Sequence, residues 1–215
     1  MPIQGFSEVF LKSIIAESLK TSQPGQWNIT RHYMYSRLQG MFTGHDGPNR
    51  KCLCISHSAF FARLLGLRNA RAIEANYPEH NLLGLSFPSD SFDFCVSDQV
   101  LEHVEGNPFT AFEESVRVTK PGGFIAHTTC FMNEIHETPK DFWRFSPDAL
   151  RLMAQHAEAV VVESGGWGNK DVWSFMALGF RTIPVPRDPM HPICRMAMEK
   201  DEAIPIVTWV VAQKQ

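Results

Sequence analysis

Residues 85–104, LSFPSDSFDFCVSDQVLEHV, are the stretch of sequence that decides the fold. They begin with a turn rich in Ser, Asp and Pro, which leads into a buried strand expected at Phe92–Ser97. A helix expected at Pro108–Val118 follows, and the run Lys120–Gly123, KPGG, ends it because Pro and Gly interrupt helices. The next strand is expected at Phe124–Cys130. A strand, a helix and a second strand in this order indicate a parallel sheet that helices cover on both faces.

Outside this region, short apolar runs alternate with helical patterns in the same way. We expect further strands at Lys51–Ser56, Ala70–Ala75, Asn81–Leu83, Val160–Glu163 and Ile204–Ala212. We expect further helices at Thr30–Met41, Ser58–Leu65, Ser146–His156 and Val172–Leu178. The sequence therefore predicts an α/β fold, a three-layer sandwich with a mostly parallel seven-stranded sheet whose last strand is antiparallel. Sheets of this kind bind ligands at the carboxyl ends of their strands.

The chain is expected to have two parts. Residues 1–50 read as a helical preface that could cap the second part, and Ser7 can begin an amphipathic helix there. Residues 51–215 form the α/β domain, which follows a loop at residues 44–49. Within this domain, residues 184–205 are rich in Pro and Met and fit neither a regular helix nor a strand. We expect this irregular segment to be a lid, or a contact surface for a homodimer or a protein partner.

Composition narrows the class of function. With 215 residues, a net charge of −3 and a pI near 6.3, the chain lacks the basic balance of a nucleic-acid-binding protein. Its five cysteines are an odd number without a CxxC pair, which is typical of reduced thiols in a cytoplasmic protein. No HExxH motif or Cys/His ligand spacing predicts a metal site. Charged residues interrupt the first apolar stretch, residues 9–19, so the sequence predicts neither a secretory signal nor a membrane span.

Two blocks of the sequence resemble one enzyme family. Leu85–Val104, followed by Arg117–Gly123 (RVTKPGG), is similar to the ordered motifs LPFPDxSFD, LEHV and RVLKPGG of the class I S-adenosylmethionine-dependent methyltransferases of the type 11 subgroup. Ile135–Pro147, IHETPKDFWRFSP, resembles a block found in one branch of that subgroup. The similarity spans residues 51–168. It implies a Rossmann-like methyltransferase fold, S-adenosylmethionine as cofactor, and methyl transfer to a small molecule such as a sugar-type or biosynthetic intermediate.

The resemblance also implies where the cofactor binds, although the glycine-rich turn of the family is altered here. The family has an acid and glycines after its first strand, whereas this chain has Cys54 for the acid, Ser56 and Ser58 for glycines, and one residue fewer. Serine is small, and its hydroxyl can donate to a carboxylate. Glu74 would accept hydrogen bonds from the ribose, and Asn81 from the adenine amino group. The full set implied for the cofactor is Ser56, His57, Ser58, Glu74, Asn81, Ser97, Asp98, Gln99 and His103.

Methyl transfer requires a nucleophile aligned with the methyl group and, where that nucleophile carries a proton, a base. His136 is the predicted base because it follows the fifth expected strand, in a loop that should reach the ligand-binding edge of the sheet. Asp141 would orient an imidazole or position a substrate hydroxyl, and Arg144 would pair with an acidic group of the substrate. A structural alternative is that Asp141 and Arg144 pair with each other. The side chains predicted to contact the substrate are Tyr33, Tyr35, Trp143 and Trp167.

Two alternatives to methyl transfer stay open on the sequence alone. The altered turn at residues 56–58 and the Met-rich segment 184–205 are compatible with a non-catalytic relative that binds a ligand or activates a partner. An enzyme of this fold with chemistry other than methyl transfer fits the same sequence. S-adenosylhomocysteine bound to the purified protein would argue against the non-catalytic alternative.

Overall fold

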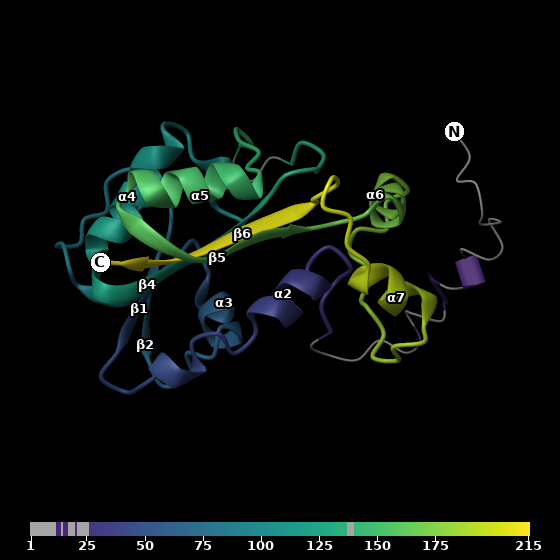
Figure 1. The fold of residues 1–215 in the computed structure, drawn as a ribbon, viewed down its shortest axis with the longest axis horizontal. Coiled ribbons are helices and arrows are strands. Elements are labelled where there is room, and N and C mark those ends of the chain that lie inside the picture. Colours follow the sequence, from purple (N-terminus) through teal and green to yellow (C-terminus); the bar gives the residue numbers. More distant parts are fainter. Residues whose placement is uncertain (1–11, 14, 17–19, 21–25, 137–139) are drawn as a thin grey trace. The chain divides into compact units, whose positions relative to one another are not determined.

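The computed structural model describes residues 12, 13, 15, 16, 20, 26–136 and 140–215. The amphipathic helix expected from Ser7 falls largely outside these residues. Six strands form one sheet (Figure 1). They are β1 (Lys51–Ile55), β2 (Arg71–Ala75), β3 (Phe92–Asp98), β4 (Thr119–Cys130), β5 (Ala159–Trp167) and β6 (Val207–Lys214). The strand order is β2-β1-β3-β4-β6-β5, and β1 pairs in parallel with both β2 and β3, as β3 does with β4.

Helices cover both faces of the sheet, as the alternation of strands and helices predicts. The α-helices are α2 (His32–Leu38), α3 (Ala59–Leu64), α4 (Pro108–Val118), α5 (Pro147–His156), α6 (Lys170–Ala177) and α7 (Pro192–Met198). Two short 3-10 helices are η1 (Thr43–His45) and η2 (Leu101–His103). Figure 1 shows α4 and α5 on one face of the sheet and α3 on the other. The three-layer α/β fold is therefore confirmed.

The central strand β3 is buried along nearly its whole length, which explains its continuous apolar run. All six residues of Phe92–Ser97 are buried, as expected for a parallel strand covered on both faces. One side packs into a core with Phe112 of α4 and Leu150 of α5. Helix α5 begins where the sequence predicts, because the Ser146 hydroxyl accepts a hydrogen bond from the Ala149 N–H at 3.2 Å and Pro147 fills the first helical position.

The strand expected at Asn81–Leu83 was a wrong prediction. This segment forms a turn, in which the Leu83 N–H donates to Asn81 Oδ1 at 2.9 Å and the Gly84 N–H donates to the Asn81 carbonyl at 3.0 Å. An asparagine side chain that bonds the backbone two residues ahead competes with strand pairing. The sheet consequently has six strands among the described residues, where the sequence predicts seven.

The Lys120–Gly123 run behaves differently from the simple helix stop that the sequence predicts. It lies within β4, where the pairing with β3 shifts register between Phe92 and Phe94. Gly123 is needed there because a Cβ would lie 2.7 Å from the carbonyl oxygen of Asp93. The run therefore ends α4 and also lets two backbone segments approach closely.

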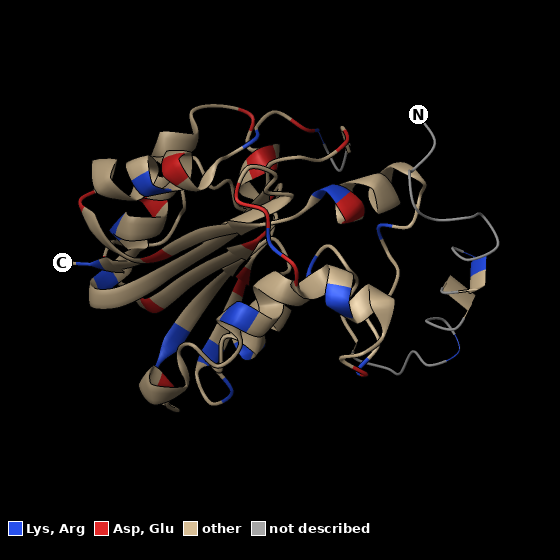
Figure 2. Ribbon diagram, turned by 45° about the vertical axis from the view of Figure 1, so that its right-hand side comes forward, with Lys and Arg blue, Asp and Glu red and all other residues tan. Residues whose placement is uncertain are grey.

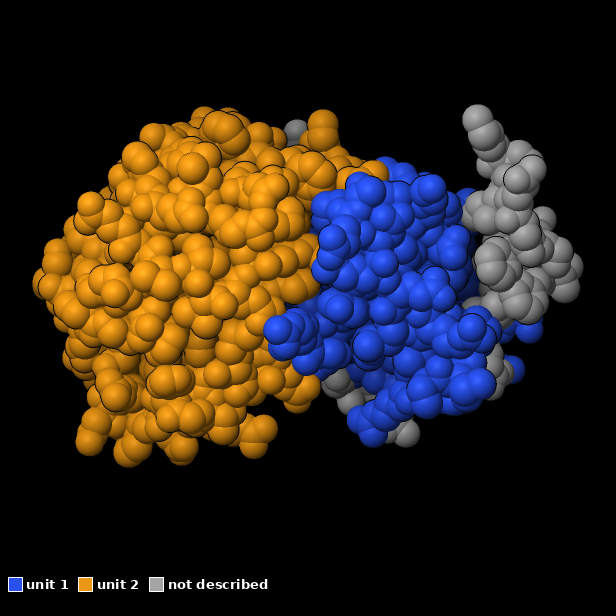
Figure 3. Space-filling view, viewed as in Figure 1, with its two compact units in different colours: residues 1–37, 167–207 blue, residues 38–166, 208–215 orange. Residues whose placement is uncertain are grey.

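The chain forms two compact units, which Figure 3 distinguishes by colour. Unit 1 consists of residues 1–37 and 167–207, and unit 2 of residues 38–166 and 208–215. This grouping differs from the expected division after residue 50, because segments distant in the sequence pair within each unit. In unit 1, for example, the Ile29 N–H donates to the Ile183 carbonyl at 2.8 Å.

The segment 184–205 contains a regular element, contrary to the expectation that it is irregular throughout. Helix α7 begins at Pro192, and the His191 ring nitrogen Nδ1 accepts from the Ile193 N–H at 3.2 Å. Pro is favourable at the first position of a helix because its missing N–H has no partner there anyway. Composition alone therefore misread a proline-initiated helix as irregular chain.

Charged side chains of both signs are mixed along the described part of the chain. Figure 2 shows Lys and Arg interspersed with Asp and Glu along the described helices and loops. Within the described residues, no helix combines the length and the apolar character needed to cross a bilayer.

Candidate active site

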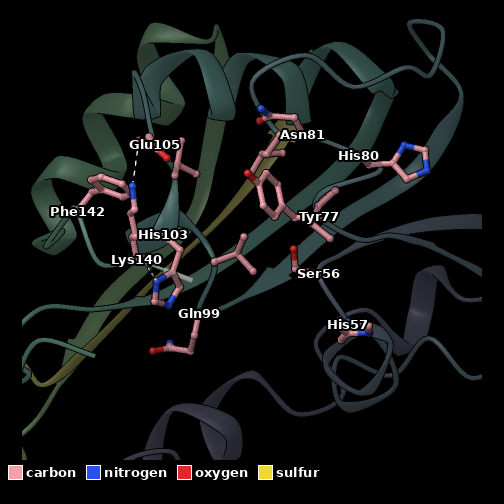
Figure 4. A pocket seen from close by; sticks show the side chains of 14 residues that line it. Ser56, His57, Tyr77, His80, Asn81, Gln99, His103, Glu105, Lys140 and Phe142 are labelled. Carbon is pink, nitrogen blue, oxygen red and sulfur yellow. Dashed lines mark hydrogen bonds and ion pairs between the residues drawn. The ribbon is translucent and has the colours of Figure 1, made fainter. Parts of the chain in front are cut away.

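A cavity of about 840 Å³ opens at the carboxyl ends of β1 and β3 (Figure 4). All of its lining residues belong to unit 2: Ile55, Ser56, His57, Tyr77, His80, Asn81, Leu82, Gln99, Val100, His103, Val104, Glu105, Lys140 and Phe142. Parallel α/β sheets bind ligands at this edge, and the volume lies in the range of small-molecule sites. Five residues implied by the sequence line the cavity, namely Ser56, His57, Asn81, Gln99 and His103.

The turn after β1 has the backbone conformation of a glycine turn without containing glycine. Ser56 has φ 49° and His57 has φ 63°, both in the left-handed region that side chains disfavour. The Ser56 N–H donates to the Ala75 carbonyl at 3.0 Å, and the His57 N–H donates to Asn76 Oδ1 at 2.9 Å. Strained backbone of this kind persists only where its surroundings enforce it, and it concentrates at functional sites.

Ser58 does not line the cavity, and its hydroxyl is engaged within the protein. The buried Oγ donates to the Ile55 carbonyl and accepts from the Asp98 N–H at 3.0 Å. The side chain thus joins the carboxyl ends of β1 and β3. Its structural effect is to hold together the two strands that frame the cavity.

Glu74 also lies outside the cavity lining. Its Oε1 accepts from the Ala59 N–H at 3.1 Å, in the first turn of α3, where a negative charge is favourable. It therefore connects β2 to the helix that follows the strained turn. Asn81, by contrast, lines the cavity from the turn that replaces the expected strand.

The three residues at the end of β3 face different surroundings. Ser97 is buried, with its Oγ 2.6 Å from Nδ1 of His127, and burial lowers the pKa of His127 to about 3. Asp98 accepts a hydrogen bond from Thr128 Oγ1. Gln99 lines the cavity with φ 58°, and its Nε2 donates to Thr128 Oγ1 at 3.1 Å. Within the described chain, Gln99 Oε1 is a buried acceptor that has no hydrogen-bond partner.

His103 lines the cavity, and one backbone contact identifies which of its ring nitrogens carries the proton. Its Nδ1 lies 2.6 Å from the Lys140 carbonyl oxygen, close to the ion pair that Lys140 Nζ forms with Glu105 at 3.6 Å (Figure 4). A carbonyl oxygen can only accept a hydrogen bond, so Nδ1 carries the proton in this contact. In the neutral ring Nε2 is then the basic nitrogen.

His136, Asp141 and Arg144 lie outside the cavity lining. Asp141 and Arg144 form an ion pair with each other, which is the structural alternative considered above. The Arg144 guanidinium lowers the pKa of Asp141 to about 2. Asp141 Oδ2 also lies 3.1 Å from Nδ1 of His136 and accepts from the His136 N–H at 2.9 Å. The ring of His136 packs edge-on against that of His103, at 4.9 Å between centroids.

None of the four residues predicted to contact substrate is among those that line the cavity. Trp143 donates from Nε1 to the Val104 carbonyl at 2.9 Å. Tyr33 stacks on Trp167 in unit 1, at 5.8 Å between ring centroids. Tyr35 is buried in the same unit, against the edge of Trp27. Tyr33, Tyr35 and Trp167 belong to unit 1, whereas Trp143 and the cavity belong to unit 2; the substrate contacts of all four residues remain predictions.

Sequence reasoning missed part of the lining. The polar and aromatic residues that it overlooked are Tyr77, His80, Glu105, Lys140 and Phe142. Tyr77 and His80 follow β2, whose carboxyl end is also at this edge of the sheet, so the aromatic residues in that loop are a sequence signal for the lining. Lys140 and Phe142 lie inside the motif at residues 135–147, of which the predicted site residues are His136, Asp141, Trp143 and Arg144.

Comparison with known proteins finds one matching family model and several solved structures with a similar fold. Residues 47–127 match a family model described as a methyltransferase domain. No curated protein matches the sequence. A methyltransferase bound to the Trm112 methyltransferase activator of Haloferax volcanii is 16% identical, with a TM-score of 0.50 over 84% of this chain and 91% of that one.

Two further solved structures share the fold. Phosphoethanolamine N-methyltransferase 2 of Haemonchus contortus, in complex with phosphomonomethylethanolamine and S-adenosylhomocysteine, is 11% identical, with a TM-score of 0.53 over 84% of this chain and 52% of that one. The cyclase SpnF is 13% identical, with a TM-score of 0.51 over 95% of this chain and 92% of that one. At these identities the comparisons carry the fold and not a substrate.

Proposed function

We propose that this chain, whose residues 47–127 match a methyltransferase family model, is a class I S-adenosylmethionine-dependent methyltransferase of type 11 that binds its cofactor in the cavity after β1 and methylates a small molecule. The observation that carries the proposal is the strained turn at Ser56 and His57. Two non-glycine residues hold left-handed backbone at the mouth of the cavity. The family uses this conformation to bring backbone close to the cofactor, and its retention without glycine argues that the close approach is still needed.

The residues present fit such a cofactor. Gln99 Oε1 is a buried acceptor at the cavity edge that needs a donor, and the hydroxyl and amino groups of a nucleoside are donors. Asn81 contributes a side-chain amide from the neighbouring turn. We propose that these two side chains contact the nucleoside. Ser58 and Glu74 support the site indirectly, through the ends of β1 and β3 and the start of α3.

His103 is the better candidate than His136 for the base. The cofactor supplies an electrophilic methyl group, so the protein must align the acceptor and remove its proton. His103 lines the cavity, and its Nδ1–H donates to Lys140, which leaves Nε2 as the nitrogen that can take a proton. His136 packs against His103 and lies beside Asp141, which is itself paired with Arg144, so the proposed role of His136 is to position the ring of His103.

A small acceptor suits this arrangement. The cavity is large enough for a nucleoside and a compact second molecule but not for a folded macromolecule. The net charge of −3 also disfavours a polyanionic acceptor such as nucleic acid. The Lys140 ammonium at the cavity wall could bind an anionic group of the acceptor.

Calorimetric titration of the full chain with S-adenosylmethionine and with S-adenosylhomocysteine tests the proposal. We expect one site per chain for each. A Gln99→Leu variant, which removes the orphaned acceptor, should bind more weakly, whereas His156→Ala, on an exposed face of α5, should bind as the unmodified protein does. No binding at millimolar cofactor would support the non-catalytic alternative instead.

A partner-binding role is the second candidate, and exposed methionines favour it. Met190 is 74% exposed and Met198 is 49% exposed, both within the segment 184–205 of unit 1. Methionine is flexible and apolar, and it is common on surfaces that bind protein partners. If the partner is a second copy of this chain, light scattering should detect a dimer that Met190→Ser and Met198→Ser together weaken. A monomer at all concentrations would exclude the homodimer.

A further inference from the structure

A second cluster of reactive side chains lies behind the wall of the cavity. Glu102 of η2, Cys130 at the end of β4 and His136 in the following loop each offer one ligand atom, and these atoms lie within 4.8 Å of one another. Glu102 and Cys130 are buried, and His136 is half-buried. We propose that these three side chains bind a zinc ion. The proposal does not depend on methyl transfer or on cofactor binding.

The set of ligand types points to zinc. A thiolate, an imidazole and a carboxylate together suit Zn²⁺, whereas magnesium and calcium take oxygen ligands almost exclusively. Ligand atoms around a tetrahedral zinc are roughly 3.3–3.8 Å apart, given bonds of about 2.0–2.3 Å. Since the ligand atoms lie within 4.8 Å of one another, the cluster has to contract by roughly 1.5 Å at most. Three protein ligands leave a fourth position for water, as in many zinc sites of enzymes.

Neighbouring side chains orient two of the three ligands. Asp141 Oδ2 lies 3.1 Å from Nδ1 of His136. A carboxylate that accepts the proton of one ring nitrogen is the usual support for a metal-binding histidine, and it leaves the other nitrogen for the ion. Thr129 Oγ1 donates to Glu102 Oε2 at 2.9 Å and holds that carboxylate in turn. The Glu134 carbonyl oxygen also lies 3.3 Å from Nδ1 of His136, so both ligands have outer polar contacts of the kind that metal sites use.

The local charges fit a divalent cation. When Cys130 binds as a thiolate, it carries one negative charge, as do the carboxylates of Glu102 and Asp141. Arg144, paired with Asp141, contributes one positive charge. Counted together with one Zn²⁺ ion, these charges sum to zero, as a buried site requires because unbalanced charge is costly there.

The site would have a structural consequence for the cavity. It would tie η2, the end of β4 and the loop that carries His136 to a single ion. His136 packs against His103, and His103 is the last residue of η2, so the ion would fix the position of the cavity-lining ring. The three ligands are spread over residues 102–136 without a recognisable spacing, so no sequence motif indicates the site.

Metal titration of the intact chain tests the site without any substrate. The protein is stripped with a chelator and titrated with Zn²⁺ by calorimetry, with metal content measured after desalting. We expect one zinc per chain, and a loss of affinity of about tenfold or more in Cys130→Ser and in Asp141→Asn. Cys194→Ser is the matched control, because Cys194 is also a buried thiol but belongs to unit 1; it should bind zinc normally.

Cobalt binding to the unmodified protein tests the site without any variant, so it still decides the proposal if a variant fails to fold. Co²⁺ bound to the unmodified protein should show a thiolate-to-cobalt charge-transfer band and the intense visible absorption of tetrahedral coordination. Absence of that band, no zinc binding at micromolar metal, or unchanged affinity in a folded Cys130→Ser variant would each overturn the proposal. Cofactor titration with and without zinc is a separate measurement, so failure of the proposed methyltransferase function would be recognised independently.

Discussion

The Nδ1 atom of His103 lies 2.6 Å from the carbonyl oxygen of Lys140, and this contact determines which ring nitrogen can act as a base. The carbonyl accepts, so Nδ1 donates, and Nε2 keeps its lone pair. Lys140 comes from the loop that also contributes Phe142 to the cavity. A residue 37 positions away in the sequence therefore determines which nitrogen of His103 carries the proton.

Replacing His103 should separate catalysis from binding. We expect His103→Gln to lower kcat by about 10²-fold or more, because it removes the proton acceptor, and to change cofactor affinity little. The measurement is kcat with an acceptor identified by screening, together with calorimetric affinity for S-adenosylhomocysteine. The variant His136→Ala should lower kcat less and shift its pH dependence, since that ring acts through His103. Full activity of His103→Gln would contradict the assignment.

Glycine at the strained turn should stabilise the protein and strengthen cofactor binding. His57→Gly relieves a left-handed φ of 63°, which we expect to add about 1 kcal/mol to the free energy of unfolding. It also removes a side chain from the cavity mouth. The control is Glu158→Gly, which relieves a similar φ of 57° away from the cavity. Urea denaturation should detect a higher free energy of unfolding in both variants. Calorimetry should detect a higher cofactor affinity in His57→Gly alone. If His57→Gly binds the cofactor no more tightly than the unmodified protein, the turn has no role in binding.

Removing the carboxylate of Glu74 should weaken cofactor binding through the backbone. In Glu74→Ala, the Ala59 N–H loses its acceptor, and the first turn of α3 loses a favourable negative charge. We expect a modest loss of stability and a clear loss of affinity for S-adenosylmethionine, with Glu74→Gln intermediate because its amide oxygen can still accept. A Glu79→Ala variant, in the loop that follows β2, is the comparison. If calorimetry finds the affinity of Glu74→Ala unchanged, Glu74 has no part in the site.

The buried ring of His127 should make the protein less stable in acid. Burial lowers the pKa of His127 to about 3 in the folded protein, against about 6.5 in the unfolded chain. Between these values the unfolded state binds more protons, so the free energy of unfolding falls as pH falls below 6.5. The slope should approach 1.4 kcal/mol per pH unit from this residue. Urea denaturation between pH 7 and pH 5 measures the slope of the free energy of unfolding against pH. If a His127→Asn variant has the same slope, other groups cause the pH dependence.

Much of the fold was predictable because the signals for it are local. The continuous apolar run at Phe92–Ser97 requires burial on both faces, and it forms the central strand. Ser146 and Pro147 mark the start of α5 by capping and by a fixed φ, whatever the rest of the chain does. Asn81–Leu83 was misassigned because a side chain to backbone hydrogen bond replaced strand pairing, and apolar residues alone do not reveal that bond.

The candidate site was predictable only where it follows strand ends. The turn at Ser56 and His57 directly follows β1, and Gln99 directly follows β3. The sequence therefore predicts the edge of the sheet at which these residues lie. The contacts of His103 with Lys140, and of Glu102 with Cys130 and His136, depend on loops whose course the sequence does not specify.

The sequence by itself determined most of the alternation of strands and helices, the buried central strand and the edge of the sheet at which the cavity opens. Each of these follows from hydrophobic period, capping and chain-breaking residues, which act over a few neighbouring positions. Only the tertiary structure decided that His103 lines the cavity while His136 lies behind it, paired with Asp141. The direction in which a loop side chain points depends on long-range contacts, and these form only when distant segments of the chain pack together.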